Sequence, residues 1–145
     1  MSQQNVELVR RTFAAFDAGG FEAMLPFFPD DVIWYTAPGW LEDPAYRGHD
    51  GARRLTALWT DNFNDFTMSA REMRDFGDRV LVLVEATGRT KEGDIPIRQL
   101  SAMLYSGFRD DKIAEVRFFL TWEEGFTAAR APASIPATGA SAEGP

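Results

Sequence analysis

The sequence lacks cysteine altogether and contains a single histidine, His49, among its 145 residues. Without cysteine it can form no disulfide framework, no thiol nucleophile and no thiolate metal site. One histidine rules out an all-histidine metal site and argues against a Ser-His-Asp triad. We therefore expect a protein that holds no metal ion and no cofactor.

Basic residues are also scarce, because 15 Lys and Arg stand against 22 Asp and Glu, which gives a net charge of −7. Proteins that bind nucleic acid or an anionic membrane surface need a basic face. No uninterrupted apolar run approaches the ~20 residues that cross a bilayer. The first ten residues lack the basic start and apolar stretch of a signal peptide. We expect a cytoplasmic protein without a nucleic-acid or membrane partner.

Aromatic residues are abundant, with 12 Phe and four Trp in a chain that is 45% hydrophobic. Such side chains fill a core, line a ligand cavity or form a subunit interface. Residues 3–129 are predicted to form one domain. Residues 130–145 are rich in Ala, Pro, Gly and Ser, with Ile135 as the one large hydrophobic residue, and are predicted to form a flexible tail.

Hydrophobic periodicity places helices before strands. Val6, Val9, Phe13 and Phe16 recur at helical spacing, with Asn5 as a plausible N-cap and Gly19-Gly20 as the end. Further elements follow: a short helix at 21–28, a strand at 32–37, a loop at 38–48, a helix from residue 49 or 50, strands at 66–76, 80–90, 95–108 and 113–121, and a closing helix at 122–129. Short turns between the last four strands predict an antiparallel meander, and the element order predicts an α+β fold.

The last strand alternates between two sets of side chains. The apolar set is predicted to face the helices and any cavity: Ala114, Val116, Phe118, Leu120 and Trp122. The mixed set is predicted to face solvent or a partner subunit: Ile113, Glu115, Arg117, Phe119 and Thr121.

Five local patterns in this order, at 16–24, 30–34, 46–48, 77–80 and 109–113, resemble the nuclear transport factor 2-like superfamily. Together they look like its SnoaL-like, ketosteroid-isomerase-like branch, over about residues 5–129. The resemblance implies a curved antiparallel β-meander wrapped around N-terminal helices in a cone-shaped α+β barrel. It also implies an internal apolar cavity and a homodimer packed through the sheet. It does not specify a reaction, because the fold hosts isomerases, cyclases, dehydratases, hydrolases and binding proteins.

The carboxylates of two known reactions of this fold are missing at the matching positions. Ketosteroid isomerases use an Asp base, a Tyr and a protonated Asp. The resemblance places Thr36 at the position of the base, Phe13 at that of the Tyr, and Leu104 or a neighbour at that of the protonated Asp. Phe28 matches a second Tyr that supports this network.

Limonene-epoxide-hydrolase-like members use an Asp-Arg-Asp set. In this sequence Arg79 matches the position of the arginine, but Leu81 and Thr121 occupy the positions of the two Asp residues. Arg79 also fits the Gly-Asp-Arg-Val turn. For the pocket Asp of SnoaL-type cyclases, no residue is assigned.

Three residues remain candidates for catalysis. Glu85 becomes a base if it points inward, where desolvation raises its pKa; the alternative is an outward face shared with Thr87 and Arg89. His49 is either an acid–base group or an exposed or capping residue. Arg98 lies on the same face of its strand as Leu104, which is the face assigned to the cavity. It either anchors a ligand carboxylate or enolate, or it extends into solvent.

The predicted substrate-binding residues form a largely aromatic set: Phe13, Phe28, Trp34, Thr36, Trp59, Leu104, Val116, Phe118 and Leu120. We expect a pocket for a small hydrophobic or aromatic molecule. The protein is then a cofactor-free isomerase, cyclase or dehydratase, or a non-catalytic binding protein for such a ligand. A protein–protein module without a usable cavity is a third reading.

Overall fold

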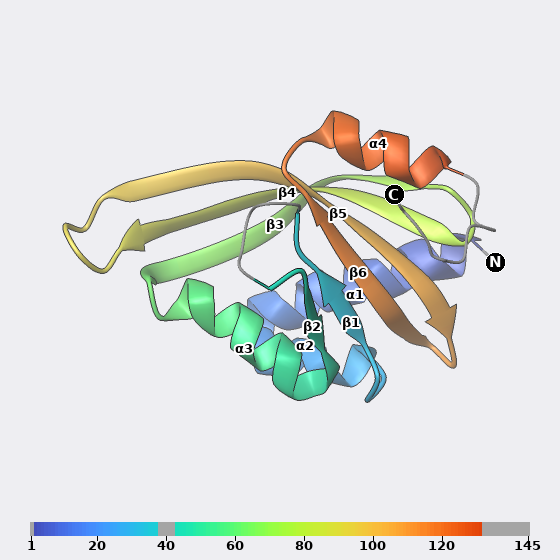
Figure 1. Cartoon of the computed structure of the whole chain (residues 1–145), viewed down its shortest axis with the longest axis horizontal. Helices are drawn as coiled ribbons and strands as arrows, with labels where there is room; N and C mark the ends of the chain where they lie inside the picture. Colours follow the sequence, from blue (N-terminus) through green and yellow to red (C-terminus); the bar gives the residue numbers. More distant parts are fainter. Residues whose placement is uncertain (1, 38–42, 132–145) are drawn as a thin grey trace.

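The computed structural model describes residues 2–37 and 43–131 of the chain (Figure 1). The predictions for residues 38–42 of the loop and for residues 132–145 of the tail lie outside the described residues. Across the described residues, helices cover both faces of one curved sheet, so the architecture is α+β as predicted.

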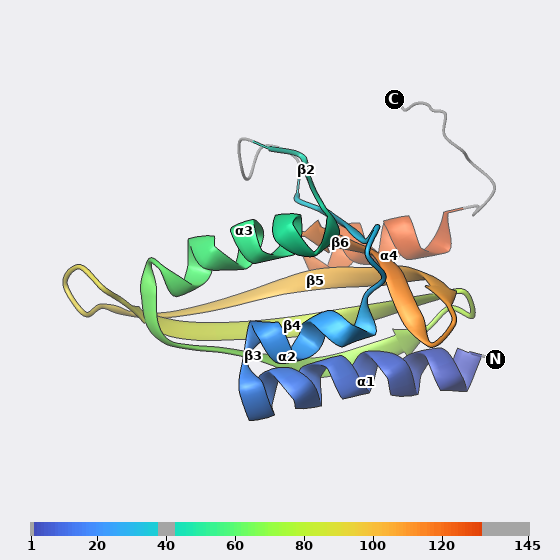
Figure 2. The ribbon, with the colours of Figure 1, turned by 90° about the horizontal axis from the view of Figure 1, so that it is seen from below.

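The chain begins with three helical pieces, α1 (Ser2–Gly19), α2 (Phe21–Met24) and η1 (Leu25–Phe27). Helix α1 runs along β3 and β4 (Figure 2) and buries the predicted face, including Val9 and Phe13. It begins before Asn5, so the predicted N-cap is wrong. The Asn5 amide instead donates to the carbonyl of Gly77 in a turn of the sheet, at 2.9 Å. Gly20, at φ +79°, ends the helix as expected.

The sheet has six strands in the order β2-β1-β6-β5-β4-β3. The strands are β1 (Ile33–Tyr35), β2 (Ala45–Arg47), β3 (Phe63–Asp75), β4 (Arg79–Thr90), β5 (Pro96–Arg109) and β6 (Lys112–Phe119), with α3 (Gly48–Thr60) between β2 and β3. Strands β3 to β6 form the predicted antiparallel meander, and β1 adds to β6 in parallel. The sequence analysis did not identify β2, because three residues are too few to show alternation.

Bulges curve the long strands. The register of β3 shifts between Asn64 and Thr67 and again between Ala70 and Glu72. Opposite β6, Gly107 adopts φ +69°, and a Cβ there would lie 2.9 Å from that of Ala114. Because a bulge bends its strand and increases the local twist, the two register shifts in β3 let the sheet curl around α1 to α3.

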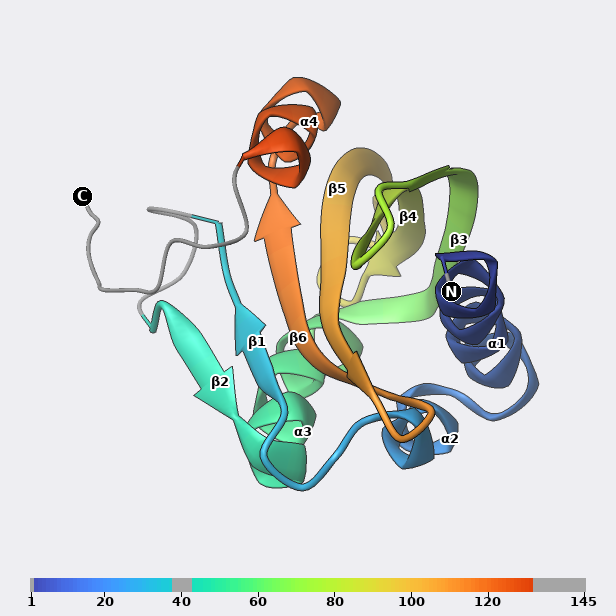
Figure 3. The ribbon, with the colours of Figure 1, turned by 90° about the vertical axis from the view of Figure 1, so that its right-hand side faces the viewer.

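The curled sheet separates two apolar clusters. The larger cluster lies on the concave side, against α1 to α3, and includes Trp34, Tyr105 and Phe118. The smaller cluster lies under α4 (Trp122–Arg130), which sits across the sheet from α3 (Figure 3), and includes Leu81 and Leu104.

Helix α4 explains why the predicted facing fails at the end of the last strand. Strand β6 ends at Phe119, and the Thr121 hydroxyl then caps α4 by accepting from the backbone N–H of Glu124 at 3.1 Å. Leu120 is 43% exposed, and Trp122 packs in the outer cluster. Val116 and Phe118 pack in the larger cluster as predicted, but so does Ile113, which was predicted to face outward. Trp122 leaves the alternation because it lies in α4, and a helix does not continue the period of a strand.

Candidate functional site

A pocket opens on the concave face of the sheet, between the end of α3 and strands β3 to β6. Its walls are mostly apolar: Trp59, Phe66, Met68, Val84, Ala86, Gln99, Ser101, Met103, Phe118, Phe119 and Leu120. About 430 Å³ is free of atoms when the open mouth is included, and about 30 Å³ of this accepts the centre of a water molecule. We call it the inner pocket.

Three aromatic rings that contact one another line the inner pocket. The rings of Trp59 and Phe66 lie 5.9 Å apart and within 10° of parallel, and Phe118 packs 5.7 Å from Trp59. The polar side chains of the lining are Gln99 and Ser101, both on β5. Neither titrates, so the described lining can hold a flat apolar molecule and bond to it but supplies no acid or base.

Seven of the nine predicted binding residues lie on the concave side, in two groups. Trp59, Phe118 and Leu120 line the inner pocket. The others lie in the core beside it: Phe13, Phe28, Trp34 and Val116. Thr36 is buried, and its hydroxyl donates to the carbonyl of Asp43 at 2.9 Å. Binding by any of these residues stays a prediction.

The facing predicted for β5 is wrong. Leu104 pairs with Leu81 and packs in the cluster under α4, on the convex side. Arg98 shares that side, while Gln99, Ser101 and Met103 face the pocket. A choice of parity that is wrong by one residue exchanges the two faces of a strand.

Glu85 points outward, on the convex face. Its carboxylate accepts hydrogen bonds from Arg98 on β5 and Arg71 on β3. These two guanidinium groups, Arg98 first, hold the pKa of Glu85 below its usual value. The group is therefore a charged structural carboxylate, and of its two predicted orientations the structure has the outward one.

His49 lies in the first turn of α3, outside the lining of the inner pocket. Its Nε2 is 2.9 Å from the carbonyl of Phe28. With Nε2 protonated, the ring donates to that carbonyl and ties the start of α3 to the end of η1. The described contacts give His49 a structural position.

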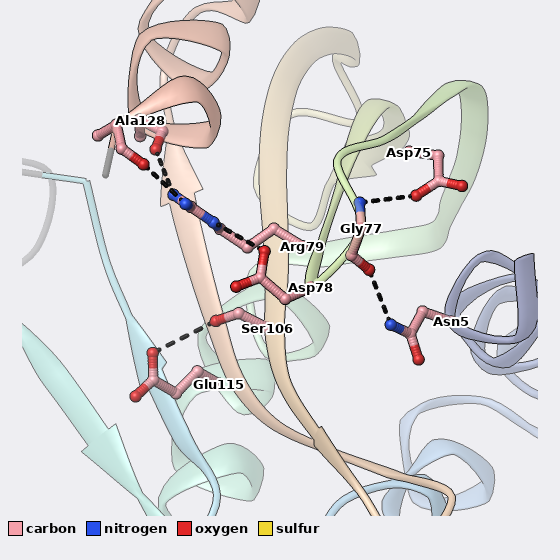
Figure 4. A network of polar contacts seen from close by, with 9 residues as sticks. Asn5, Asp75, Gly77, Asp78, Arg79, Ser106, Glu115 and Ala128 are labelled. Carbon is pink, nitrogen blue, oxygen red and sulfur yellow. Dashed lines mark hydrogen bonds and ion pairs between the residues drawn. The ribbon is translucent and has the colours of Figure 1, made fainter. Parts of the chain in front are cut away.

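Arg79 holds helix α4 on the convex face (Figure 4). Its guanidinium donates to the carbonyl of Ala128 at 3.0 Å and to that of Ala131 at 2.7 Å. A cation at a helix C-terminus satisfies carbonyls that have no partner within the helix. Arg79 thus binds backbone rather than bridging a pair of catalytic acids.

Sequence reasoning missed several pocket residues: Phe66, Met68, Val84, Ala86, Gln99, Ser101, Met103 and Phe119. The signal that could have found three of them was the alternation of Gln99, Ser101 and Met103 along one face of β5. Because Gln99 and Ser101 are polar, that face was assigned to solvent.

The described residues contain no group of three or more acidic or histidine side chains placed to hold a metal ion. None of their helices is long and apolar enough to cross a membrane.

The chain is similar to known proteins in both sequence and fold. A family model that describes a SnoaL-like domain matches residues 9–116. An NTF2-like protein from Burkholderia xenovorans LB400 is 24% identical, with a TM-score of 0.65 over 90% of this chain and 98% of that one. No curated protein matches the chain.

Two further solved structures are similar. A candidate SnoaL-like polyketide cyclase from Jannaschia sp. CCS1 is 20% identical, with a TM-score of 0.69 over 90% of this chain and 94% of that one. TerC, co-crystallized with polyporic acid, is 19% identical, with a TM-score of 0.69 over 88% of this chain and 99% of that one. Likenesses at these identities show the fold.

Proposed function

Since the chain belongs to the SnoaL-like domain family, we propose that it binds a small hydrophobic or aromatic molecule in the inner pocket, without acid–base chemistry. The observation that carries this proposal is the described lining, in which aromatic and aliphatic side chains surround one amide and one hydroxyl. An apolar pocket with a few polar groups is the usual form of a small-molecule site.

The stacked rings favour a flat ligand. Trp59 and Phe66 already lie parallel, so a planar molecule that displaces Phe66 can stack on Trp59 in its place. Gln99 and Ser101 then orient the molecule by hydrogen bonds. The structurally similar TerC was co-crystallized with polyporic acid, which is consistent with a small-molecule ligand for a protein of this fold.

The test measures the affinity of the protein for 1-aminoanthracene through the change in fluorescence of this molecule on binding. Ala86→Phe fills the inner pocket and is expected to weaken binding at least tenfold. Thr87→Phe is the matched control, because Thr87 is the next residue on β4 and bonds outward to Thr67. Met68→Ala enlarges the pocket and is expected to tighten binding. Equal affinity in all four proteins, each shown to be folded by its melting temperature, would contradict the proposal.

A cofactor-free isomerase, cyclase or dehydratase is the second candidate. The family, and the Jannaschia protein described as a candidate polyketide cyclase, favour it. An experiment in D₂O distinguishes the two functions. The tightest-binding molecule is incubated with the protein and then examined by NMR. Binding alone returns the molecule unchanged, whereas an enzyme exchanges a carbon-bound hydrogen or forms a new product.

We also propose a homodimer packed through the convex face. Helix α4 covers part of that face, and beyond it Leu100 is 44% exposed beside Arg98 and Glu85. Light scattering is expected to give twice the chain mass for the wild type. Leu100→Asp is expected to give the monomer, while the exposed Leu58→Asp on α3 serves as the control. A wild-type monomer overturns this proposal.

A further inference from the structure

A second hollow lies between α2, η1 and α3, and it shares no lining residue with the inner pocket. Its lining is Phe21, Glu22, Met24, Leu25, Phe28, Trp34, Ala52, Arg53 and Thr56. The space open to the centre of a water molecule is about 10 Å³, which is about the room that one water needs. We call it the helix hollow.

Trp34 lines the helix hollow and carries a buried donor that has no partner in the described part of the chain. Its side chain is 2% exposed, and its indole N–H has no hydrogen-bond partner among the described residues. The ring packs against Phe28 at 5.2 Å and Phe118 at 5.9 Å, and neither phenyl ring offers a lone pair. A buried donor without an acceptor is unfavourable, so an oxygen in the hollow would remove that cost.

Thr56 supplies the complementary group. It is 8% exposed, and its hydroxyl donates to the carbonyl of Arg53 at 3.2 Å, which leaves its oxygen lone pairs to accept. A neutral hydroxyl can accept from Trp34 and donate to Thr56 at the same time. The other buried walls are apolar, which favours an uncharged ligand.

Two charged side chains of the lining, Arg53 and Glu22, lie at the surface. Arg53 pairs with Glu22 at 2.8 Å and with Asp50 at 3.0 Å, and the Arg53 side chain is 49% exposed. Its positive charge is thus already engaged by two carboxylates. Exposed ion pairs of this kind contribute little to stability, so Arg53 can swing away and admit a ring.

We propose that the helix hollow is a second binding site, which takes the hydroxyl group of a small phenol-like molecule. The indole N–H of Trp34 donates to the hydroxyl oxygen, the hydroxyl in turn donates to the Thr56 oxygen, and the ring lies against Met24 and Leu25. This site goes beyond the ligand proposed for the inner pocket and does not depend on it.

The experiment is a titration of the ¹⁵N-labelled protein with phenol and, separately, with toluene, observed at the indole N–H of Trp34 by NMR. Trp34→Phe assigns that signal. Phenol is expected to shift it in a saturable way and to bind about tenfold more tightly than toluene, which is the effect of one hydrogen bond. Thr56→Val keeps the shape of the site and is expected to remove most of the preference for phenol.

Two results would overturn the inference. One is an indole signal that does not saturate with phenol. The other is a long-lived water beside Trp34, seen as a nuclear Overhauser effect that phenol does not abolish, which makes the hollow a hydration site only. Ala86→Phe, which fills the inner pocket, is expected to leave the phenol response unchanged. Loss of the response in that variant would place phenol in the inner pocket and also refute a second site.

Discussion

The two faces of the curved sheet use the same strands for opposite chemistry. On the concave face, the described lining of the inner pocket is built from rings, aliphatic chains, an amide and a hydroxyl. On the convex face, Glu85 is bracketed by Arg71 and Arg98, and Arg79 holds the end of α4. Successive residues of one strand separate these environments, since side chains alternate across a sheet.

The difference shows how a titratable residue in the sequence can mislead. A charge is costly on the enclosed face, where water is excluded, and tolerable on the face that meets solvent. Glu85 and Arg98 therefore stabilise each other on the outside rather than serving a reaction inside. What the concave face offers instead is a shape for an apolar molecule.

The largest expected effect comes from emptying the concave face. Phe118 is 4% exposed and packs on Trp34 and Trp59, so Phe118→Ala is expected to lower the free energy of unfolding by about 3–5 kcal/mol. Urea unfolding measures it. On the convex face, Leu100→Ala is expected to cost under about 0.5 kcal/mol in the monomer, because surface substitutions have small effects. Similar losses in the two variants would contradict the comparison.

Arg79 tests whether helix α4 depends on polar contacts to stay on the convex face. Arg79→Met keeps the aliphatic stem but removes the donors to Ala128 and Ala131. A loss of about 1.5–3 kcal/mol is expected, the range for hydrogen bonds that involve a charged group. Urea unfolding measures the loss, and hydrogen exchange should show α4 opening before the strands. Unchanged exchange in α4 would mean that apolar packing alone holds the helix.

Tyr105 is an ionisable residue buried on the concave side. It is fully buried, its hydroxyl lies 3.8 Å from Met103 Sδ, and burial raises its pKa far above the usual 10.0, with a hydrogen bond to Thr12 opposing that rise. Tyr105→Phe is expected to cost about 1 kcal/mol at pH 7.

The pH dependence of stability gives a sharper test of the same residue. The raised pKa keeps the folded phenol neutral, so its stabilising effect is complete below pH 10.0 and is lost as the pH rises above that value, where the unfolded state ionises. Wild type should therefore lose more stability than Tyr105→Phe between pH 9 and 11. Parallel urea midpoints in that range would show that the buried phenol ionises normally.

The sequence predicted the meander and the helical face of α1, because hydrophobic period and turn residues are local signals. It did not predict that β5 presents Gln99, Ser101 and Met103 to the pocket. That facing depends on α4, which covers Leu104 on the convex side. A contact between segments far apart in the sequence does not appear in the hydrophobic periodicity of either segment. Residue type alone favoured Leu104 for the cavity and the hydroxyl of Ser101 for solvent.

Glu85 gives the smallest effect, and its pH dependence shows on which face the carboxylate acts. Arg98 and Arg71 lower its pKa in the folded state, while the unfolded chain keeps a value near 4.5. The stabilising effect is therefore complete above about pH 4.5 and is lost as the pH falls through the lowered folded value. Glu85→Gln should be less stable than wild type at pH 7 by urea unfolding, and the gap should close on acidification. Because both guanidinium groups are about half exposed or more, 0.5 M NaCl should also narrow the gap. A gap that widens in acid would mean that Glu85 is protonated in the folded state, as an inward-facing carboxyl would be.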